Sequence, residues 1–330
     1  MALSTTTTQA SNILNEILHD RILKALTPKS VISQLFNQDS IDGAASLSKE
    51  YVKLADDGPA TAGTEGNDFT TITTMGFDTT VTVTPTEAAV ARADLTTRAM
   101  RRESPGMSAS EVYSKFQSGD FMGLANLLAD KAERLYRMCA EKLEVDCAAV
   151  IDDYSDTVGS TGVDITIANV LDAIYKLEAN EPEHEAFAFI FHAEQTNTIR
   201  SLLLAQAAAS ASAGLWVTQA DASLVNFNTD AAKNGLKGSF LNIPVYQPSN
   251  SVNPLPNAGA DVAGALIAVG QGRPGEGLRG PNVILEGHAP TFLIDVDPSA
   301  RSVELLCIHE YAVGEITDGH GVSIITDAPA

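Results

Sequence analysis

The longest regular pattern in the sequence is a stripe of apolar residues over residues 120–151. Apolar side chains recur there at steps of three and four, which places them on one face of a helix. The members of the stripe are Phe121, Leu124, Leu128, Ala132, Leu135, Cys139, Leu143, Cys147 and Val150. The opposite face carries charged residues, among them Glu133, Arg137 and Glu141 at i,i+4 spacing. The pattern predicts one helix, about 45 Å long at roughly 1.5 Å per residue.

A threonine-rich segment, residues 56–86, precedes this helix and has few large apolar side chains. Residues 69–74 and 79–84 are alternating or β-branched, and Gly76 lies between them. This arrangement is typical of a β-hairpin. Because an isolated two-stranded ribbon is marginal in water, we expect the hairpin to rest on another surface.

The C-terminal half alternates short helices and strands. Helices are expected at 167–177 and 198–209, strands at 186–192, 236–247, 265–269, 291–295 and 303–310, and a polar end near 322–326. Residues 1–50 contain a polar tract and short amphipathic pieces, which is typical of an arm that packs on something else. The whole pattern predicts an α+β protein with two principal domains, an arm and a loop.

The composition indicates a sizeable hydrophobic core and a net charge that is unevenly distributed along the chain. The chain has 330 residues, of which 44% are hydrophobic, so it can bury a sizeable core. Its formal net charge of −21 excludes a surface that holds nucleic acid by neutralising phosphates. Counted by segment, the net charge is −1 for residues 1–50, −5 for 51–150 and −15 for 151–330. The mixed-sign N-terminal parts suit contacts between neighbouring molecules, and we expect Arg92, Arg98, Arg101 and Arg102 to make such contacts depend on salt.

Three cysteines, Cys139, Cys147 and Cys307, are too few for a disulfide framework, and a reducing compartment is expected. Cys139 and Cys147 would lie about 12 Å apart on the helix, too far for a disulfide, so we expect both in the core. The first residues lack a secretory signal, and residues 201–217 fall short of a membrane span. We therefore expect a soluble intracellular protein with no membrane partner.

One glycine pattern matches a nucleotide-binding motif. Gly270-x-Gly272-x-x-Gly275 follows an apolar strand, as a dinucleotide fingerprint does. Pro274 and Pro281 interrupt the helix that should follow, so no helix N-terminus is available for a pyrophosphate. An ordinary glycine-rich loop is the better interpretation.

Two histidine patterns are candidates for metal sites. His192-x-Glu194 is half of a zinc-deaminase motif, but no P-C-x-x-C follows it. His309, Glu310, Glu315 and His320 lie close in sequence without an HExxH motif. We expect no catalytic residues, no cofactor and no metal. A metal-dependent hydrolase using His309 and His320 stays open as an alternative.

The order of elements resembles the major capsid proteins of tailed bacteriophages, which have the Hong Kong 97 type of fold. Residues 1–50 resemble the N-terminal arm of that family, the threonine-rich hairpin its extended E-loop, and residues 120–151 its spine helix. The buried strand and helix at 186–209 resemble its strand-then-helix unit. The resemblance implies an N-terminal arm at 1–50, an E-loop hairpin at 51–90, a peripheral domain at 91–160 and 289–330, and an axial domain at 161–288.

The resemblance implies a structural protein and not an enzyme. Copies would assemble as hexamers and pentamers into an icosahedral shell, the virion capsid, around double-stranded DNA that is contacted weakly. Each E-loop would lie over a neighbouring subunit, and assembly in the host cytoplasm would involve scaffolding and portal proteins and a decoration protein. The inter-subunit contact candidates are Phe69, Phe77, Arg92, Arg98, Arg101 and Arg102.

Two departures from the family matter. Some members cross-link neighbours through an E-loop lysine and an asparagine, but here no lysine occurs between Lys53 and Lys115, and no asparagine follows Asn282. We therefore expect non-covalent shells. The long N-terminal scaffolding extension of some members is absent, which fits a separate scaffolding protein. An encapsulin-like nanocompartment, which shares the fold and stores an enzyme, is the nearest alternative.

Overall fold

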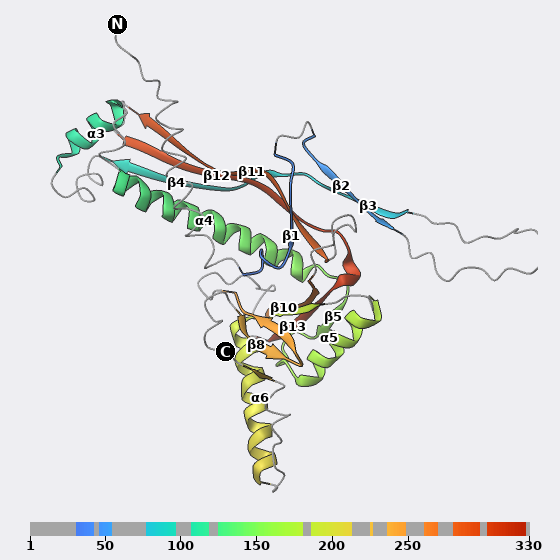
Figure 1. Cartoon of the computed structure of the whole chain (residues 1–330). Coiled ribbons are helices and arrows are strands. Elements are labelled where there is room, and N and C mark those ends of the chain that lie inside the picture. Colours follow the sequence, from blue (N-terminus) through green and yellow to red (C-terminus); the bar gives the residue numbers. More distant parts are fainter. Residues whose placement is uncertain are drawn as a thin grey trace, which may run out of the picture.

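A computed structural model describes the backbone of residues 31–42, 46–54, 77–96, 107–118, 125–180, 186–212, 225–226, 236–248, 261–269, 280–297 and 302–327. Within these residues the strands form a four-stranded sheet, a seven-stranded sheet and a two-stranded ribbon. Figure 1 shows one long helix, α4 (Ala125–Asp152), running along the four-stranded sheet toward the seven-stranded one. The expected α+β class is confirmed.

The four-stranded sheet has the order β1 (Asn37–Ser40), β11 (Asn282–Asp297), β12 (Ser302–Glu315) and β4 (Thr86–Thr96). Strand β1 lies parallel to β11, whereas β11, β12 and β4 are antiparallel neighbours. The apolar stripe of α4 covers one face of this sheet, where Leu135 and Tyr136 pack with Leu305 and Phe292. The predicted spine helix is confirmed from residue 125 to residue 151, and residues 120–124 lie outside the described part of the chain.

The seven-stranded sheet has the order β5 (Thr157–Gly159), β13 (Gly321–Asp327), β10 (Asp261–Ala268), β6 (Phe187–Ile190), β9 (Ile243–Tyr246), β8 (Leu236–Phe240) and β7 (Val225–Asn226). Helix α5 (Ile167–Asn180) buries Val170, Ala173 and Leu177 in a core shared with Phe189 and Leu266 of the sheet. Helix α6 (Ala193–Ser212) follows β6 directly and projects away from the sheet (Figure 1).

Two predicted elements need correction. Residues 236–247 form a hairpin and not one strand, because Leu241 and Asn242 adopt positive φ values of 51° and 66° and reverse the chain. Residues 322–326 are not a polar end. They form the centre of β13, where Val322, Ser323 and Ile324 are fully buried between β10 and β5.

The ribbon pairs differently from the prediction. Strand β3 (Phe77–Val83) contains most of the expected 79–84 strand, but its partner is β2 (Lys49–Leu54), and residues 69–74 and Gly76 lie outside the described residues. The base of the ribbon rests on the four-stranded sheet, because Tyr51 and Val83 pack against Val283 and Leu285. The rest of the ribbon extends away from the sheet (Figure 1).

The division into domains stays a prediction, with one strand placed otherwise. Strand β11 crosses the proposed boundary at residues 288/289. Strand β13, assigned with β12 to the peripheral part, instead pairs with β10 in the seven-stranded sheet. The chain makes this crossing between Glu315 and Gly321, and Tyr154, two residues after the end of α4, packs closely against Gly321 there.

Candidate assembly surfaces and their supporting networks

The four-stranded sheet leaves its second face uncovered by α4. On β4, Ala89, Ala91 and Leu95 are buried beneath the helix, so the alternating side chains Val90 and Arg92 point to the opposite face. Val90 is 55% exposed and Leu293 on β11 is 51% exposed. We call this surface the outer face. Its members are Val90, Arg92, Asp94, Thr291, Leu293, Asp295, Glu304, Leu306 and Ile308.

The register arranges the outer face in three rows across β4, β12 and β11. The first row holds Val90, Ile308 and Thr291, the second Arg92, Leu306 and Leu293, and the third Asp94, Glu304 and Asp295. Two largely apolar rows therefore border one acidic row. Like charges directly opposite one another destabilise a sheet. Arg92 reduces this repulsion by donating to Asp94 at 2.7 Å and to Glu304 at 2.5 Å.

The structure describes only part of the predicted contact set. Arg92 lies on the outer face, where it is exposed and already paired within its own chain. The main chain of Phe77 begins β3 and pairs with Leu54. Phe69, Arg98, Arg101 and Arg102 lie outside the described residues, so the structure does not bring the set together and the contact roles stay predictions.

A buried carboxylate ties the turn at residues 31–36 to the spine helix. Glu144 on α4 is only 5% exposed. Its Oε1 accepts hydrogen bonds from the main-chain N–H groups of Val31 at 2.7 Å and Ile32 at 2.6 Å, and its Oε2 accepts one from Ser33 at 3.3 Å. Burial raises the pKa of Glu144, and the three N–H groups oppose that shift. We call this contact the arm anchor, because it fixes the chain where the predicted arm meets the body.

A second polar network joins α4 to the inner face of the sheet. The Tyr311 hydroxyl on β12 donates to Asp146 of α4 at 2.7 Å. The ring of Tyr311 lies 4.7 Å from the ring of His309, centroid to centroid, and His309 contacts Glu286 of β11 at 3.1 Å. Burial and the hydrogen bond to Asp146 raise the pKa of Tyr311, so the hydroxyl keeps its proton and remains a donor.

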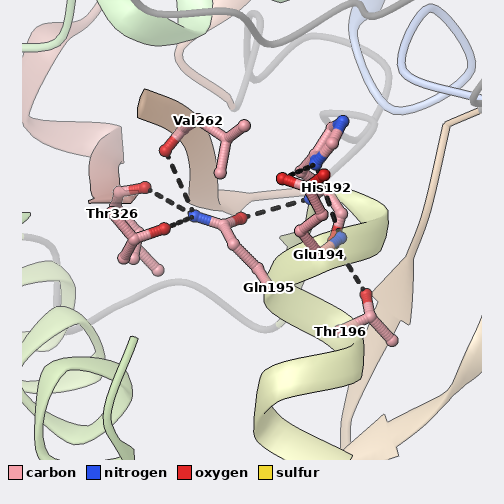
Figure 2. A network of polar contacts seen from close by, with 7 residues as sticks. His192, Glu194, Gln195, Thr196, Val262 and Thr326 are labelled. Atoms are coloured by element: carbon pink, nitrogen blue, oxygen red, sulfur yellow. Dashed lines mark hydrogen bonds and ion pairs between the residues drawn. The ribbon is translucent and has the colours of Figure 1, made fainter. Parts of the chain in front are cut away.

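A third network fixes the start of α6 to the seven-stranded sheet (Figure 2). The Gln195 side chain accepts from the His192 N–H at 3.1 Å and donates to the Ile324 carbonyl at 3.0 Å and to the Thr326 hydroxyl at 2.9 Å. Gly264 makes room for this amide, because a Cβ at that position would overlap the Gln195 oxygen. One glutamine therefore caps a helix and bridges to β13.

Neither histidine pattern forms a metal centre in the structure. Within the described ranges, no group of three or more His, Cys, Asp or Glu side chains is placed to hold a metal ion. His309 contacts Glu286, and His192 lies 3.7 Å from Glu194. His320 ends the short helical turn before β13 of the seven-stranded sheet, whereas His309 lies in β12 of the four-stranded sheet. Among the described helices, none has the length and apolar character to cross a membrane.

Sequence reasoning missed the two anchoring side chains. Glu144 lies beside Leu143 on the apolar side of the helix stripe, and a lone carboxylate there was the available signal. Gln195 follows a buried strand at the third position after His192, which is where a side chain can cap a helix start.

Comparisons with solved structures identify the fold. The chain is similar to the head structure of Helicobacter pylori bacteriophage KHP40, at 12% identity and a TM-score of 0.53 over 88% of each chain. It is similar to the mature capsid of bacteriophage PhiM1, at 11% identity and a TM-score of 0.53 over 89% of this chain and 86% of that chain. The chain has the Hong Kong 97 type of fold of tailed-phage major capsid proteins, and the recognition of that fold is confirmed.

The same fold occurs in a compartment protein. The chain matches the holo-SrpI encapsulin complex from Synechococcus elongatus PCC 7942, at 10% identity and a TM-score of 0.52 over 90% of this chain and 87% of that chain. No protein-family model and no curated protein matches the sequence. At these identities the likeness establishes the fold alone.

Proposed function

We propose that this chain is a major capsid protein, which assembles as hexamers and pentamers into an icosahedral shell that encloses double-stranded DNA in the virion. The observation that carries the proposal is the shared fold across nearly nine-tenths of two phage head proteins. Assembly in the host cytoplasm with scaffolding and portal proteins, and later binding of a decoration protein, belong to the same proposal.

The outer face supports a role in assembly. Val90 and Leu293 are exposed beside Leu306 and Ile308, so this face offers apolar area that a neighbouring molecule can cover. Each such contact is modest, but closure of a shell adds many of them within one particle. The ribbon β2–β3 extends away from the four-stranded sheet on which its base rests, so it is one described element that can reach a neighbour (Figure 1).

The charge distribution supports a container for DNA. Residues 151–330 carry 22 acidic and 7 basic side chains. Each phosphate that a wall neutralises strengthens retention of the genome, so an acidic wall lets packaged DNA slide and leave.

Electron microscopy of the expressed full-length protein, with and without its scaffolding protein, tests the proposal. We expect closed shells of uniform size that sediment as megadalton particles. A protein that stays monomeric under both conditions would overturn the proposal.

Substitutions on the outer face test which surface drives assembly. A Val90→Asp and Leu293→Asp double variant places charge on the apolar rows and is expected to fold but not to form shells. Val163→Asp is the control, because Val163 is also 51% exposed but lies beside the seven-stranded sheet, where its carbonyl accepts from the Asp327 N–H. Shells that form equally well from all three proteins would exclude the outer face as a contact surface.

Two expectations from the sequence, one on salt dependence and one on covalent cross-links, extend the proposal. Arg101→Glu and Arg102→Glu should alter the salt dependence of assembly, and shells indifferent to both changes would contradict a role for these arginines. Shells should also be non-covalent, so a denaturing gel of mature particles should show monomer. A ladder of covalent oligomers would contradict this expectation.

An encapsulin-like compartment is the second candidate, favoured by the likeness to the SrpI encapsulin. Analysis of the lumen of purified particles separates the two. DNA that survives nuclease treatment of intact particles supports the capsid, whereas a single enzyme as cargo supports the compartment.

A further inference from the structure

Two of the three buried cysteines meet between the spine helix and the four-stranded sheet. Cys139 projects from α4 and Cys307 from β12, and both belong to the core cluster between these elements. The Cys139 Sγ lies 3.8 Å from the Cys307 carbonyl oxygen and 3.9 Å from the Ala89 carbonyl oxygen. Cys147 lies two turns further along α4 and belongs to a different cluster. The fold thus brings two thiols that are 168 positions apart into hydrogen-bonding contact and leaves the third in another cluster.

The two paired thiols have different chemical character. A hydrogen bond with the Cys307 thiol lowers the pKa of Cys139, and the same contact together with burial raises the pKa of Cys307. Burial is the main cause that raises the pKa of Cys147. Because the thiolate is the nucleophile, the lowered pKa favours Cys139 as the first to react, and Cys307 lies in contact with it to react with the oxidised product.

We propose that hydrogen peroxide oxidises Cys139 and Cys307 to a disulfide, which cross-links α4 to β12. The Cys139 thiolate attacks one peroxide oxygen, the O–O bond breaks, and a sulfenic acid and hydroxide form. The Cys307 sulfur then attacks the Cys139 sulfur, the S–O bond breaks, and the departing hydroxide takes the Cys307 proton as water. Overall, two thiols and one hydrogen peroxide give one disulfide and two waters, so the thiols are oxidised and the peroxide is reduced.

The site favours this oxidant over a larger one. Both cysteines are at most 2% exposed, so a bulky disulfide reagent cannot reach them without extensive unfolding, whereas peroxide is close to water in size. The product would join the helix and sheet that form one core, and it would restrict the unfolded chain over a long loop.

Peptide mapping of the folded full-length protein tests the proposal. The protein is treated with hydrogen peroxide, free thiols are blocked with iodoacetamide during denaturation, and trypsin digestion is followed by mass spectrometry without reductant. Trypsin places the cysteines in three separate peptides, residues 138–142, 143–176 and 302–330. We expect a linked species of 138–142 with 302–330, lighter by two hydrogen atoms than the sum of its parts and released by dithiothreitol.

Variants keep the test specific. Cys147→Ala removes an equally buried thiol and should leave the linked species unchanged, whereas Cys139→Ala should abolish it. Treated protein should also unfold at a higher urea concentration, and dithiothreitol should reverse that shift. Three results would overturn the proposal: a link that uses Cys147, sulfinic or sulfonic acid at Cys139 without any link, or three free thiols after treatment. If Cys139→Ala does not fold, the wild-type and Cys147→Ala maps still decide the matter.

Discussion

Replacement of Glu144 should loosen the arm anchor selectively. The carboxylate accepts three main-chain N–H groups, from Val31, Ile32 and Ser33, and all three residues are buried. In Glu144→Gln one oxygen remains as an acceptor, and the new amide N–H₂ group faces donors. In Glu144→Ala all three N–H groups lose their acceptor.

The magnitude follows from these contacts. A hydrogen bond to a charged group contributes roughly 1.5–3 kcal/mol, and a buried donor left without a partner costs roughly 1–3 kcal/mol. We therefore expect Glu144→Gln to lower the free energy of unfolding by about 2 kcal/mol. Glu144→Ala should lower it by about 3 kcal/mol or more. Relief of the cost of burying the carboxylate offsets part of each loss, in line with its raised pKa.

Hydrogen exchange and urea unfolding of the unassembled subunit provide the assay. The amides of residues 31–36 should exchange about 30-fold faster in Glu144→Gln, the factor that about 2 kcal/mol represents. Amides of α5 should keep their protection. Glu133→Gln makes the same chemical change at the exposed i,i+4 pair with Arg137 and should shift stability by no more than about 0.5 kcal/mol. Unchanged protection of residues 31–36 in Glu144→Ala would refute the argument that the carboxylate holds this turn.

Three further predictions rest on buried contacts. Gln195→Leu leaves the hydrogen-bond partners of the amide, including Thr326, without that bond, and should lower the free energy of unfolding by roughly 2–4 kcal/mol in urea titrations. A loss within experimental error would contradict the bridging role. Gly321→Ala should cost roughly 1–3 kcal/mol, because its Cβ would overlap the Tyr154 ring, and a melting temperature equal to the wild type would count against that overlap. Because burial raises the pKa of Glu144 above its ordinary value of about 4.5, the protonated side chain stabilises the fold at low pH, and this contribution is lost as the pH rises through the raised pKa. The difference in the free energy of unfolding between wild type and Glu144→Gln should therefore shrink from pH 4 to pH 7, and a difference that grows would contradict the prediction.

The sequence pattern predicted the long helix and the class of fold because these depend on periodicity. The stripe through Leu135 and Cys139 repeats along a helix of 28 residues. Its first part packs on the four-stranded sheet, and its last part, with Cys147, packs on the seven-stranded sheet. The alternation in β12 was found for the same reason, since Val303 and Leu305 are buried and Glu304 between them is not. Long, regular patterns outweigh local exceptions.

Shorter elements and single anchors were missed because their signals are local. Helix α3 (Ala109–Ser118) was not predicted, although Ser108 and Glu111 form a capping box in which Glu111 accepts from the Ser108 N–H at 2.7 Å. The turn at Leu241 and Asn242 carries no glycine to mark it. Pairing of β2 with β3 spans the threonine-rich segment and depends on packing of Tyr51 against the sheet, which no local pattern reveals.

The order of strands in the four-stranded sheet has a consequence for synthesis. Strands β1 and β4 are complete by residue 96, but their partners β11 and β12 begin only at residues 282 and 302. At roughly 5–20 residues per second, the ribosome takes about 10–40 s to supply β12 after β4 has emerged. During that interval the part of α4 that packs on Leu305 and Cys307 has only β4 to cover it. A chain that terminates early therefore never builds the outer face, and only complete copies can join an assembly through it.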